Sequence, residues 1–123
     1  MFTKKSDIKK IGRLKKRSDF LRVQQVGRKW VSKGMIVEIA ENDALGIRYG
    51  LTVSKKVSKL AVTRNRVKRR LKAAACDVLP AFAQLNLDIV LIGRQSSEER
   101  DYTDLQNDLR WCLKKMNIEA PND

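Results

Sequence analysis

Histidine is absent from this chain of 123 residues, and cysteine, proline and aromatic residues are scarce. Without histidine the protein lacks the commonest general base, the commonest metal ligand and any Ser-His or Cys-His catalytic pair. Cys76 and Cys112 have no cysteine or histidine neighbours at metal-binding spacing, so we expect them to be reduced thiols. We therefore predict no catalytic residue and assign no metal ligand.

Long apolar runs are also missing. No stretch approaches the roughly 20 apolar residues that a membrane-spanning helix needs. In residues 1–17, Ile8 and Ile11 stand alone among charged residues, so this segment lacks the apolar centre of a secretory signal. These absences predict a cytoplasmic protein with no membrane partner.

Acidic residues are few relative to basic ones, since 27 Lys and Arg against 14 Asp and Glu leave a formal charge of +13. Such a charge predicts a polyanionic partner. Composition and pattern favour a nucleic acid without separating RNA from DNA, and the alternatives are an anionic membrane, an acidic protein or a merely solvated surface. We predict a flexible basic arm at residues 1–17, one RNA-binding domain at 18–116 and a tail at 117–123.

The hydrophobic pattern predicts the order helix, three strands, helix, strand, helix. We expect helices from Ser18 to Gly27, from Thr63 to about Leu79 and from about Ser97 to Met116, with Ser18 and Thr63 as N-caps. Alternation predicts extended segments within 30–40, at 46–54 and at 87–92. Together these elements predict an α+β fold with three helices and a small mixed sheet of about four strands.

The segment 55–74 combines dense positive charge with regularly spaced apolar residues. At about 100° per residue, Val67, Leu71 and Ala74 share one stripe of the predicted second helix. That stripe would anchor the helix to the sheet and hold the cations in a fixed array, which suits contacts with phosphates. The polar residues expected on the outer side are Asn65, Arg69 and Lys72, flanked by Arg66 and Lys68.

The residues "LTVSKKVSKLAVTRNRVKRRLKAA" closely resemble the signature of the bacterial ribonuclease P protein subunit. The segment "RLKKRSDF", residues 13–20, resembles the start of that family's first helix, so the resemblance covers nearly the whole chain. The matching positions are Lys55-Lys56, Arg64-Asn65-Arg66, Lys68-Arg69 and Lys72.

This resemblance implies a small protein that binds a large catalytic RNA, in a holoenzyme that removes the 5′ leader from precursor tRNA. In that family the RNA performs the hydrolysis, so the resemblance implies Mg²⁺ bound mainly by the RNA subunit, a protein that is inactive alone and no DNA partner. It also implies a left-handed βαβ crossover between the strands at 46–54 and 87–92, where general topology rules favour a right-handed one. A ribosome-associated RNA binder and a DNA-compacting protein are the alternative functions.

The resemblance implies two sets of binding residues. One is a cleft for the single-stranded leader between the first helix and the sheet, with Phe20, Ile36, Arg48 and Thr52; ordinary core packing is the alternative role for Phe20. The other set would contact the catalytic RNA and comprises Lys55, Lys56, Arg64, Asn65, Arg66, Lys68, Arg69, Arg70 and Lys72.

Two positions depart from the family's commoner pattern. Gln24 and Glu38 stand where many members carry an aromatic residue, so base stacking in the cleft is expected to be weaker. We expect Glu38 to form an ion pair with a nearby Lys or Arg, and the alternative is that it approaches a metal ion bound to the leader. Trp30 and Trp111 are not assigned to RNA.

Overall fold

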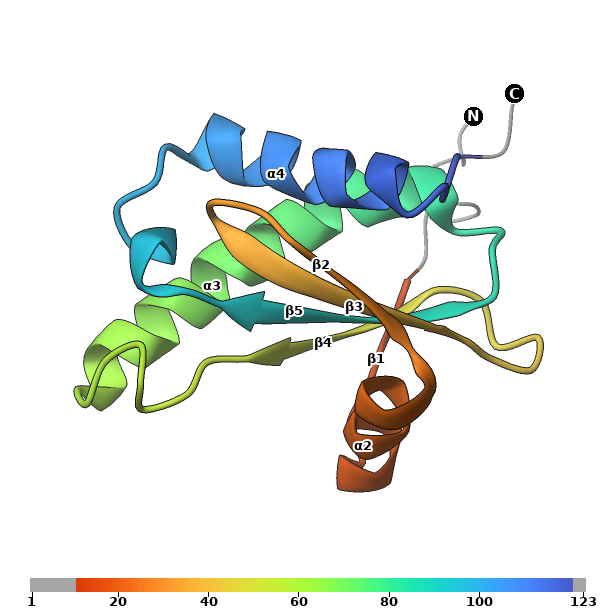
Figure 1. Cartoon of the computed structure of the whole chain (residues 1–123), viewed down its shortest axis with the longest axis horizontal. Helices are drawn as coiled ribbons and strands as arrows, with labels where there is room; N and C mark the ends of the chain where they lie inside the picture. Colours follow the sequence, from red (N-terminus) through yellow and green to blue (C-terminus); the bar gives the residue numbers. More distant parts are fainter. Residues whose placement is uncertain (1–10, 121–123) are drawn as a thin grey trace, which may run out of the picture.

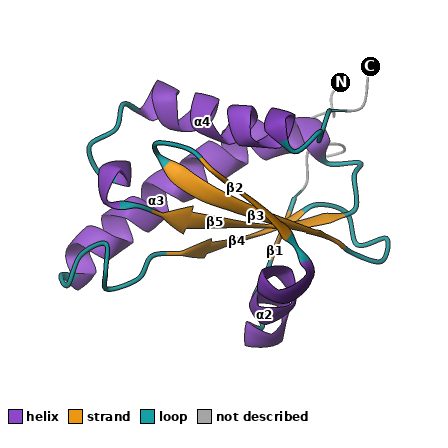
Figure 2. Cartoon of the chain, in the orientation of Figure 1, coloured by secondary structure: helices purple, strands orange, loops and turns teal. Residues whose placement is uncertain are grey.

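The computed structural model describes residues 11–120. A mixed sheet of five strands, in the order β1-β4-β5-β3-β2, has helices α3 and α4 on one face and α2 on the other (Figures 1 and 2). The elements are β1 (Gly12–Arg13), α2 (Arg17–Val26), β2 (Arg28–Val31), β3 (Met35–Glu41), β4 (Arg48–Thr52), α3 (Ala61–Val78), η1 (Leu79–Phe82), β5 (Leu87–Gly93), η2 (Gln95–Ser97) and α4 (Tyr102–Lys115).

The predicted α+β class with three helices is confirmed, and the strand alternation assigns the two faces of the sheet correctly. Val37 on β3 and Tyr49 on β4 are buried, and both contribute to the main core beneath α3 and α4. Residues of β5 complete this core, because its alternate positions Ile89 and Leu91 are fully buried. The strand alternation therefore leaves the other face of the same strands for α2.

A smaller cluster forms between that second face and α2. Val23 from α2 packs with Leu14, Ala40 and Val90, all buried, and the ring of Phe20 lies partly buried against them. Because successive strand residues face opposite sides, one sheet supports two separate packing layers. The side chains between α2 and the sheet thus belong to a surface distinct from α3.

Strands β4 and β5 are parallel neighbours, paired from Arg48 with Asp88 to Thr52 with Ile92. Helix α3 connects them, so the predicted βαβ unit is present between the predicted strands. Its left-handed sense stays a prediction from the family resemblance.

The fifth strand is a correction to the sequence prediction. Gly12 and Arg13 pair in parallel with β4, and the N–H groups of Gly12 and Leu14 donate to Ile47 and Tyr49 carbonyls at 2.8 Å. Two residues are too few for an alternation signal, so the pairing was not visible in the sequence. Residues 11–17 of the predicted flexible arm thus include β1 and the first residue of α2, and residues 1–10 lie outside the described part.

The two predicted N-caps are also corrected. Helix α2 begins after Lys16 and α3 after Leu60, and neither of these side chains caps its helix. Ser18 and Thr63 instead lie within the first turns, so packing against the sheet decides where these helices begin. This agrees with the general weakness of local helix signals relative to tertiary packing.

Both cysteines are free thiols, as predicted, with Cys76 exposed and Cys112 buried. Over residues 11–120, no helix is sufficiently long and apolar to traverse a bilayer.

Candidate nucleic-acid interface

Helix α3 presents a fixed array of cations to solvent. Its apolar stripe is buried as predicted, with Val67, Leu71 and Ala74 fully inaccessible and Val78 nearly so. The exposed polar residues on the outer side of the helix are Asn65, Lys68, Arg69 and Lys72. A helix anchored this firmly positions its outer side chains at a lower entropic cost than a disordered segment would.

The amino end of α3 adds to the positive potential. Its first turn contains no acidic residue, so nothing compensates the partial positive charge of the unpaired N–H groups there. Cations near a helix amino terminus are unfavourable for helix stability by themselves. Their presence here indicates a surface suited to an anionic partner.

Three arginines of the predicted RNA-binding set also make contacts within the protein. The Arg64 guanidinium donates to the carbonyls of Ser58 and Lys59, both at 2.9 Å, and so stabilises the loop before the helix. Arg66 pairs with Glu98 at 2.5 Å, and Arg70 donates to the Arg100 carbonyl. These three side chains therefore connect α3 to the loop before it and to residues 98–100, in addition to their predicted role in RNA binding.

Lys55 and Lys56 lie in the turn that follows β4, and both side chains are exposed. The backbone of this turn is ordered, because the Lys56 N–H donates to Ser54 Oγ at 3.2 Å and the Val57 N–H to the Ser54 carbonyl at 3.0 Å. The two lysines thus extend the cationic surface from α3 toward the end of β4.

An open cleft of about 490 Å³ lies between α2 and the sheet. Phe20 and Thr52, two of the four residues predicted for a leader cleft, line it. Gln24 and Glu38, which the sequence analysis singled out as departures from the family pattern, also line it, and the lining residues that the sequence prediction missed are Lys15, Arg17, Leu21, Val90 and Ile92. Lys15 and Arg17 could have been found from their position just before Phe20, since they lie at the start of α2, the helix that forms one wall.

Ile36 and Arg48 lie on the predicted face of the sheet but outside the lining of this cleft. Ile36 pairs with Ile92 on β5 and lines a neighbouring hollow instead. Arg48 is engaged by Asp88, its Nε and an Nη donating to the two carboxylate oxygens at 2.8 and 2.7 Å. The structure thus places Phe20 and Thr52 in the lining of one cleft and engages Arg48 with Asp88.

The Asp88 carboxylate is completely buried and fully paired. Besides Arg48, it accepts hydrogen bonds from Arg22 on α2 and from the Asn42 amide at 2.8 Å. Burial alone would raise the pKa of Asp88, but the hydrogen bonds from Arg48, Asn42 and Arg22 and the charge of Arg48 lower it below its ordinary value. This network fixes the base of α2 on the sheet and so defines one end of the cleft.

The expected ion pair of Glu38 is not formed within residues 11–120. None of the five ion pairs in that part of the chain includes Glu38. The nearest cross-strand cation is Lys29, whose Cα is the register partner of Glu38, but its side chain is exposed and does not reach. Glu38 therefore presents a half-buried carboxylate to the cleft, with Gln24 opposite it on α2.

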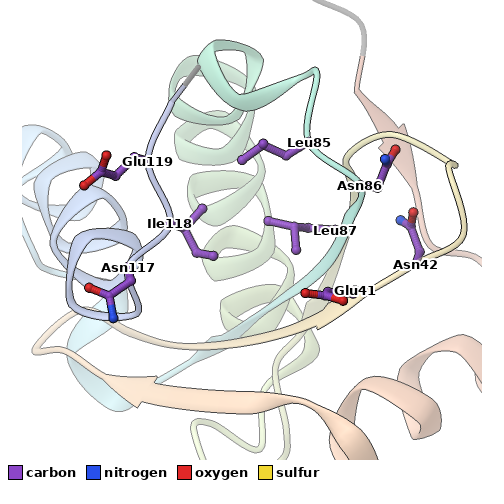
Figure 3. A pocket seen from close by; sticks show the side chains of 8 residues that line it. All are labelled: Glu41, Asn42, Leu85, Asn86, Leu87, Asn117, Ile118 and Glu119. Carbon is purple, nitrogen blue, oxygen red and sulfur yellow. The ribbon is translucent and has the colours of Figure 1, made fainter. Parts of the chain in front are cut away.

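A third hollow, of about 550 Å³, lies where β3 ends beside the segment after α4. Leu85, Leu87 and Ile118 extend toward its middle, while Glu41 and Glu119 stand at its rim (Figure 3). Carboxylates repel phosphates, so this hollow is a poor site for a nucleic acid. In the described part of the chain, no three His, Cys, Asp or Glu residues are grouped so as to hold a metal ion.

Comparison with known proteins agrees with this architecture. The chain is 46% identical over 112 residues to the "Ribonuclease P protein component" of Paramagnetospirillum magneticum, covering 87% of this chain and 84% of the relative. The protein of the same name from Ruegeria pomeroyi is 45% identical over 112 residues, with 88% of each covered.

Among solved structures, the RNase P protein of Staphylococcus aureus matches with a TM-score of 0.72 at 30% identity, covering 86% of this chain and 95% of that chain. The sequence model of the family described as Ribonuclease P matches residues 8–117. The chain therefore belongs to the ribonuclease P protein family.

Proposed function

We propose that this chain is the protein subunit of a ribonucleoprotein ribonuclease P, and that it assists removal of the 5′ leader from precursor tRNA. The observation that supports the proposal is the presence of a cationic helix surface and of a cleft with an aromatic residue on opposite faces of one sheet. The outer side of α3 carries exposed cations, and the cleft beside α2 has an aromatic wall. Because the chain belongs to the ribonuclease P protein family, we infer that these two surfaces serve the removal of the 5′ leader.

The α3 surface is suited to the catalytic RNA. Asn65, Lys68, Arg69 and Lys72 project from a rigid helix, so they can match the fixed spacing of phosphates in a folded RNA. Asn65 can both donate and accept hydrogen bonds, whereas the cations only donate. Lys55 and Lys56 extend this surface, while Arg64, Arg66 and Arg70 contribute charge from positions partly tied to the protein.

The α2 cleft is suited to a single strand, which is the state of a 5′ leader. Phe20 offers an aromatic edge or face on which a base can stack, and Lys15 and Arg17 lie where the strand's phosphates would pass. Ile92, Val90 and Thr52 line it from the sheet and offer a largely apolar surface to an unpaired base. The cleft has a single aromatic residue, so we expect moderate leader affinity.

Catalytic chemistry is assigned to the RNA subunit and not to this chain. Mg²⁺, when bound there, would supply the activated water and stabilise the leaving oxygen. The described residues offer no grouped carboxylates for such an ion, so this chain's part is to hold the RNA and the leader. We infer that the protein alone does not cleave precursor tRNA.

The proposal is tested by reconstitution with a bacterial ribonuclease P RNA at low Mg²⁺. We expect leader removal with RNA plus protein, little with RNA alone at that concentration and none with protein alone. Cleavage at the mature 5′ end by the RNA-free protein would overturn the assignment of catalysis. Failure of the protein to bind that RNA while it co-sediments with ribosomal subunits would favour a ribosome-associated role.

Phe20→Ala tests the cleft separately. We expect unchanged affinity for the RNA subunit and a loss of the preference of the holoenzyme for precursor over mature tRNA, by the roughly 1–3 kcal/mol of one stacked base. Leu45→Ala is the matched control, since Leu45 is an exposed apolar residue in the turn between β3 and β4, outside the cleft. Equal losses in both variants would contradict a specific role for Phe20.

A further inference from the structure

The two tryptophans of the chain lie together at one edge of the molecule. Trp30 belongs to β2, the last strand of the sheet, and Trp111 to the neighbouring helix α4. Their ring centroids are 6.2 Å apart and the rings are inclined by 65°, an edge-to-face arrangement. The side chains are nevertheless 38% and 44% exposed, and Val31 beside them is 47% exposed.

This edge-to-face contact leaves indole faces available. In such a pair the edge of one ring covers one face of the other, so it hides only one of the four faces. The core beneath is complete without them, because Leu109, Cys112 and Leu113 of α4 are already buried. Exposed indoles at this position are therefore not explained by the packing of the fold.

An open hollow of about 570 Å³ adjoins Trp111. Val31 and Lys33 line it from the end of β2 and the turn after it, and Arg94 lines it from the segment after β5. Asp108 also lines the hollow, and its carboxylate accepts two hydrogen bonds from the Arg100 guanidinium, at 2.5 and 3.1 Å. The hollow thus combines an apolar wall with basic side chains, and the carboxylate of Asp108 is neutralised by Arg100.

Four basic residues lie near the two indole rings. Lys115 Nζ lies 5.8 Å from the centroid of the Trp111 ring, and Arg28 donates to the Met116 carbonyl at 3.0 Å. Lys33 and Lys114 are exposed nearby on the turn and on α4. Within residues 11–120 none of these four basic residues forms an ion pair. Asp104, an exposed acid on this side of α4, lies two helical turns before Trp111. Its negative charge helps to raise the pKa of Arg100.

We propose that this tryptophan surface, formed by Trp30, Val31, Lys33, Trp111 and Lys115, binds a segment of single-stranded RNA. Bases would stack on the indoles while the lysines contact the phosphates, a combination that is typical of sequence-tolerant single-strand binding. A second copy of the chain is disfavoured because each copy carries a formal charge of +13. An acidic peptide would use the lysines but leave the flat indole faces without a partner.

The site is separate from both surfaces of the proposed function. Strand β2 is at the opposite edge of the sheet from β1, and α4 packs on β2 and β3 whereas α3 packs on β4 and β5 (Figure 1). The α2 cleft is on the other face of the sheet. The tryptophan surface would therefore be a third RNA contact, which can succeed or fail independently of leader removal.

Intrinsic fluorescence tests the proposal directly, because both tryptophans of the chain are at the site. The full-length protein is titrated with an eight-nucleotide oligouridylate, an abasic ribose-phosphate oligomer of the same length, and an oligoglutamate. We expect saturable quenching by the RNA, and at least several-fold weaker binding of the abasic oligomer. Equal quenching by all three would show a purely electrostatic effect and overturn the proposal, as would no saturable quenching by the RNA.

Variants sharpen the test. Trp111→Ala should weaken oligouridylate binding, followed through Trp30, by about 5- to 100-fold, the equivalent of one lost base stack. A double variant, Lys33→Gln with Lys115→Gln, changes only exposed charges and should weaken binding several-fold without altering the melting temperature. Leu45→Ala is the control and should bind as the unchanged protein does. Unaltered binding in the double variant, or a dimer in sedimentation that Trp111→Ala abolishes, would overturn the proposal.

Discussion

At the scale of single residues, Asp88 connects three parts of the chain. Its buried carboxylate accepts from Arg48 on β4, from Arg22 on α2 and from Asn42 in the turn after β3. The side chains of Arg22 and Arg48 are partly exposed whereas Asp88 is buried, so water only partly screens the attraction between their charges. The network sets the position of α2, and with it the wall of the cleft.

Replacing Asp88 by asparagine should lower the free energy of unfolding at pH 7 by about 1.5–3 kcal/mol, because charge-assisted hydrogen bonds are lost while the shape is kept. The folded-state pKa of Asp88 lies below its ordinary value, so its contribution is fully present above the unfolded-state pKa of roughly 3.9. It is lost as the pH falls from there through the lower folded-state pKa. Chemical denaturation of both proteins between about pH 2.5 and 7 measures the difference.

The control for this substitution is Asp43→Asn, which changes an exposed carboxylate in the turn between β3 and β4. It should alter stability by less than about 0.5 kcal/mol. If the two variants unfold alike at pH 7, Asp88 does not hold α2 to the sheet.

At the scale of elements, α2 approaches the sheet closely because β4 has a glycine beneath it. A Cβ at Gly50 would lie 2.5 Å from Cε2 and 2.6 Å from Cζ of Phe20, and 3.3 Å from the Leu14 Cβ. No such contact is tolerated, so the aromatic ring occupies the space that a side chain at position 50 would need. The depth of the cleft thus depends on a residue that does not line it.

Gly50→Ala should therefore displace Phe20 and destabilise the protein by about 1–3 kcal/mol, the usual cost of overpacking. It should also reduce the preference of the reconstituted holoenzyme for precursor over mature tRNA. Equilibrium unfolding and tRNA binding measure the two effects. Gly12→Ala is the comparison, since the atom nearest to its added Cβ would be Arg48 Cγ at 3.2 Å, a milder contact that should cost less stability. A stable Gly50→Ala protein with unchanged tRNA preference would contradict this account.

We expect the cations of helix α3 to divide between RNA binding and internal support. Arg69→Ala should leave the free energy of unfolding within about 0.5 kcal/mol and reduce the slope of log affinity against log salt by about 0.7–0.9, the effect of one phosphate contact. Arg64→Ala should instead cost about 0.5–1.5 kcal/mol of stability, because it removes hydrogen bonds to the Ser58 and Lys59 carbonyls. Salt-dependent binding and thermal unfolding of both variants separate the roles. The reverse pattern, with Arg69→Ala unstable and Arg64→Ala stable, would refute this division.

At the scale of the whole molecule, a formal charge of +13 on 123 residues predicts that the affinity for RNA depends strongly on salt. If about five cations of the α3 surface neutralise phosphates, log affinity for the RNA subunit should fall with log salt at a slope of about −4 to −5. Titrations at several potassium concentrations measure the slope, and a neutral osmolyte serves as the control. A slope near zero would mean that base contacts or apolar burial dominate the assembly.

Several features of the fold were predictable from local patterns. Alternation placed Val37 and Tyr49 on the core face and Thr52 on the other, and helical spacing identified Val67 and Leu71 as the anchor of α3. These predictions were correct because periodicity depends only on residues that are close together in sequence. It can be recognised without knowing which element the segment packs against. The N-caps and β1 were missed because packing, rather than a local signal, decides those boundaries.

The sequence alone determined the class of fold, the faces of the strands and the positive array on an amphipathic helix, since all three depend on residues a few positions apart. Only the tertiary structure decided that Arg48 binds Asp88 instead of lining the cleft, that Arg66 and Arg70 support the helix, and that Trp30 meets Trp111. The physical reason is that these contacts join residues distant in sequence. Their distances are set by how the sheet orders its strands and where each helix packs on it, which no local period records.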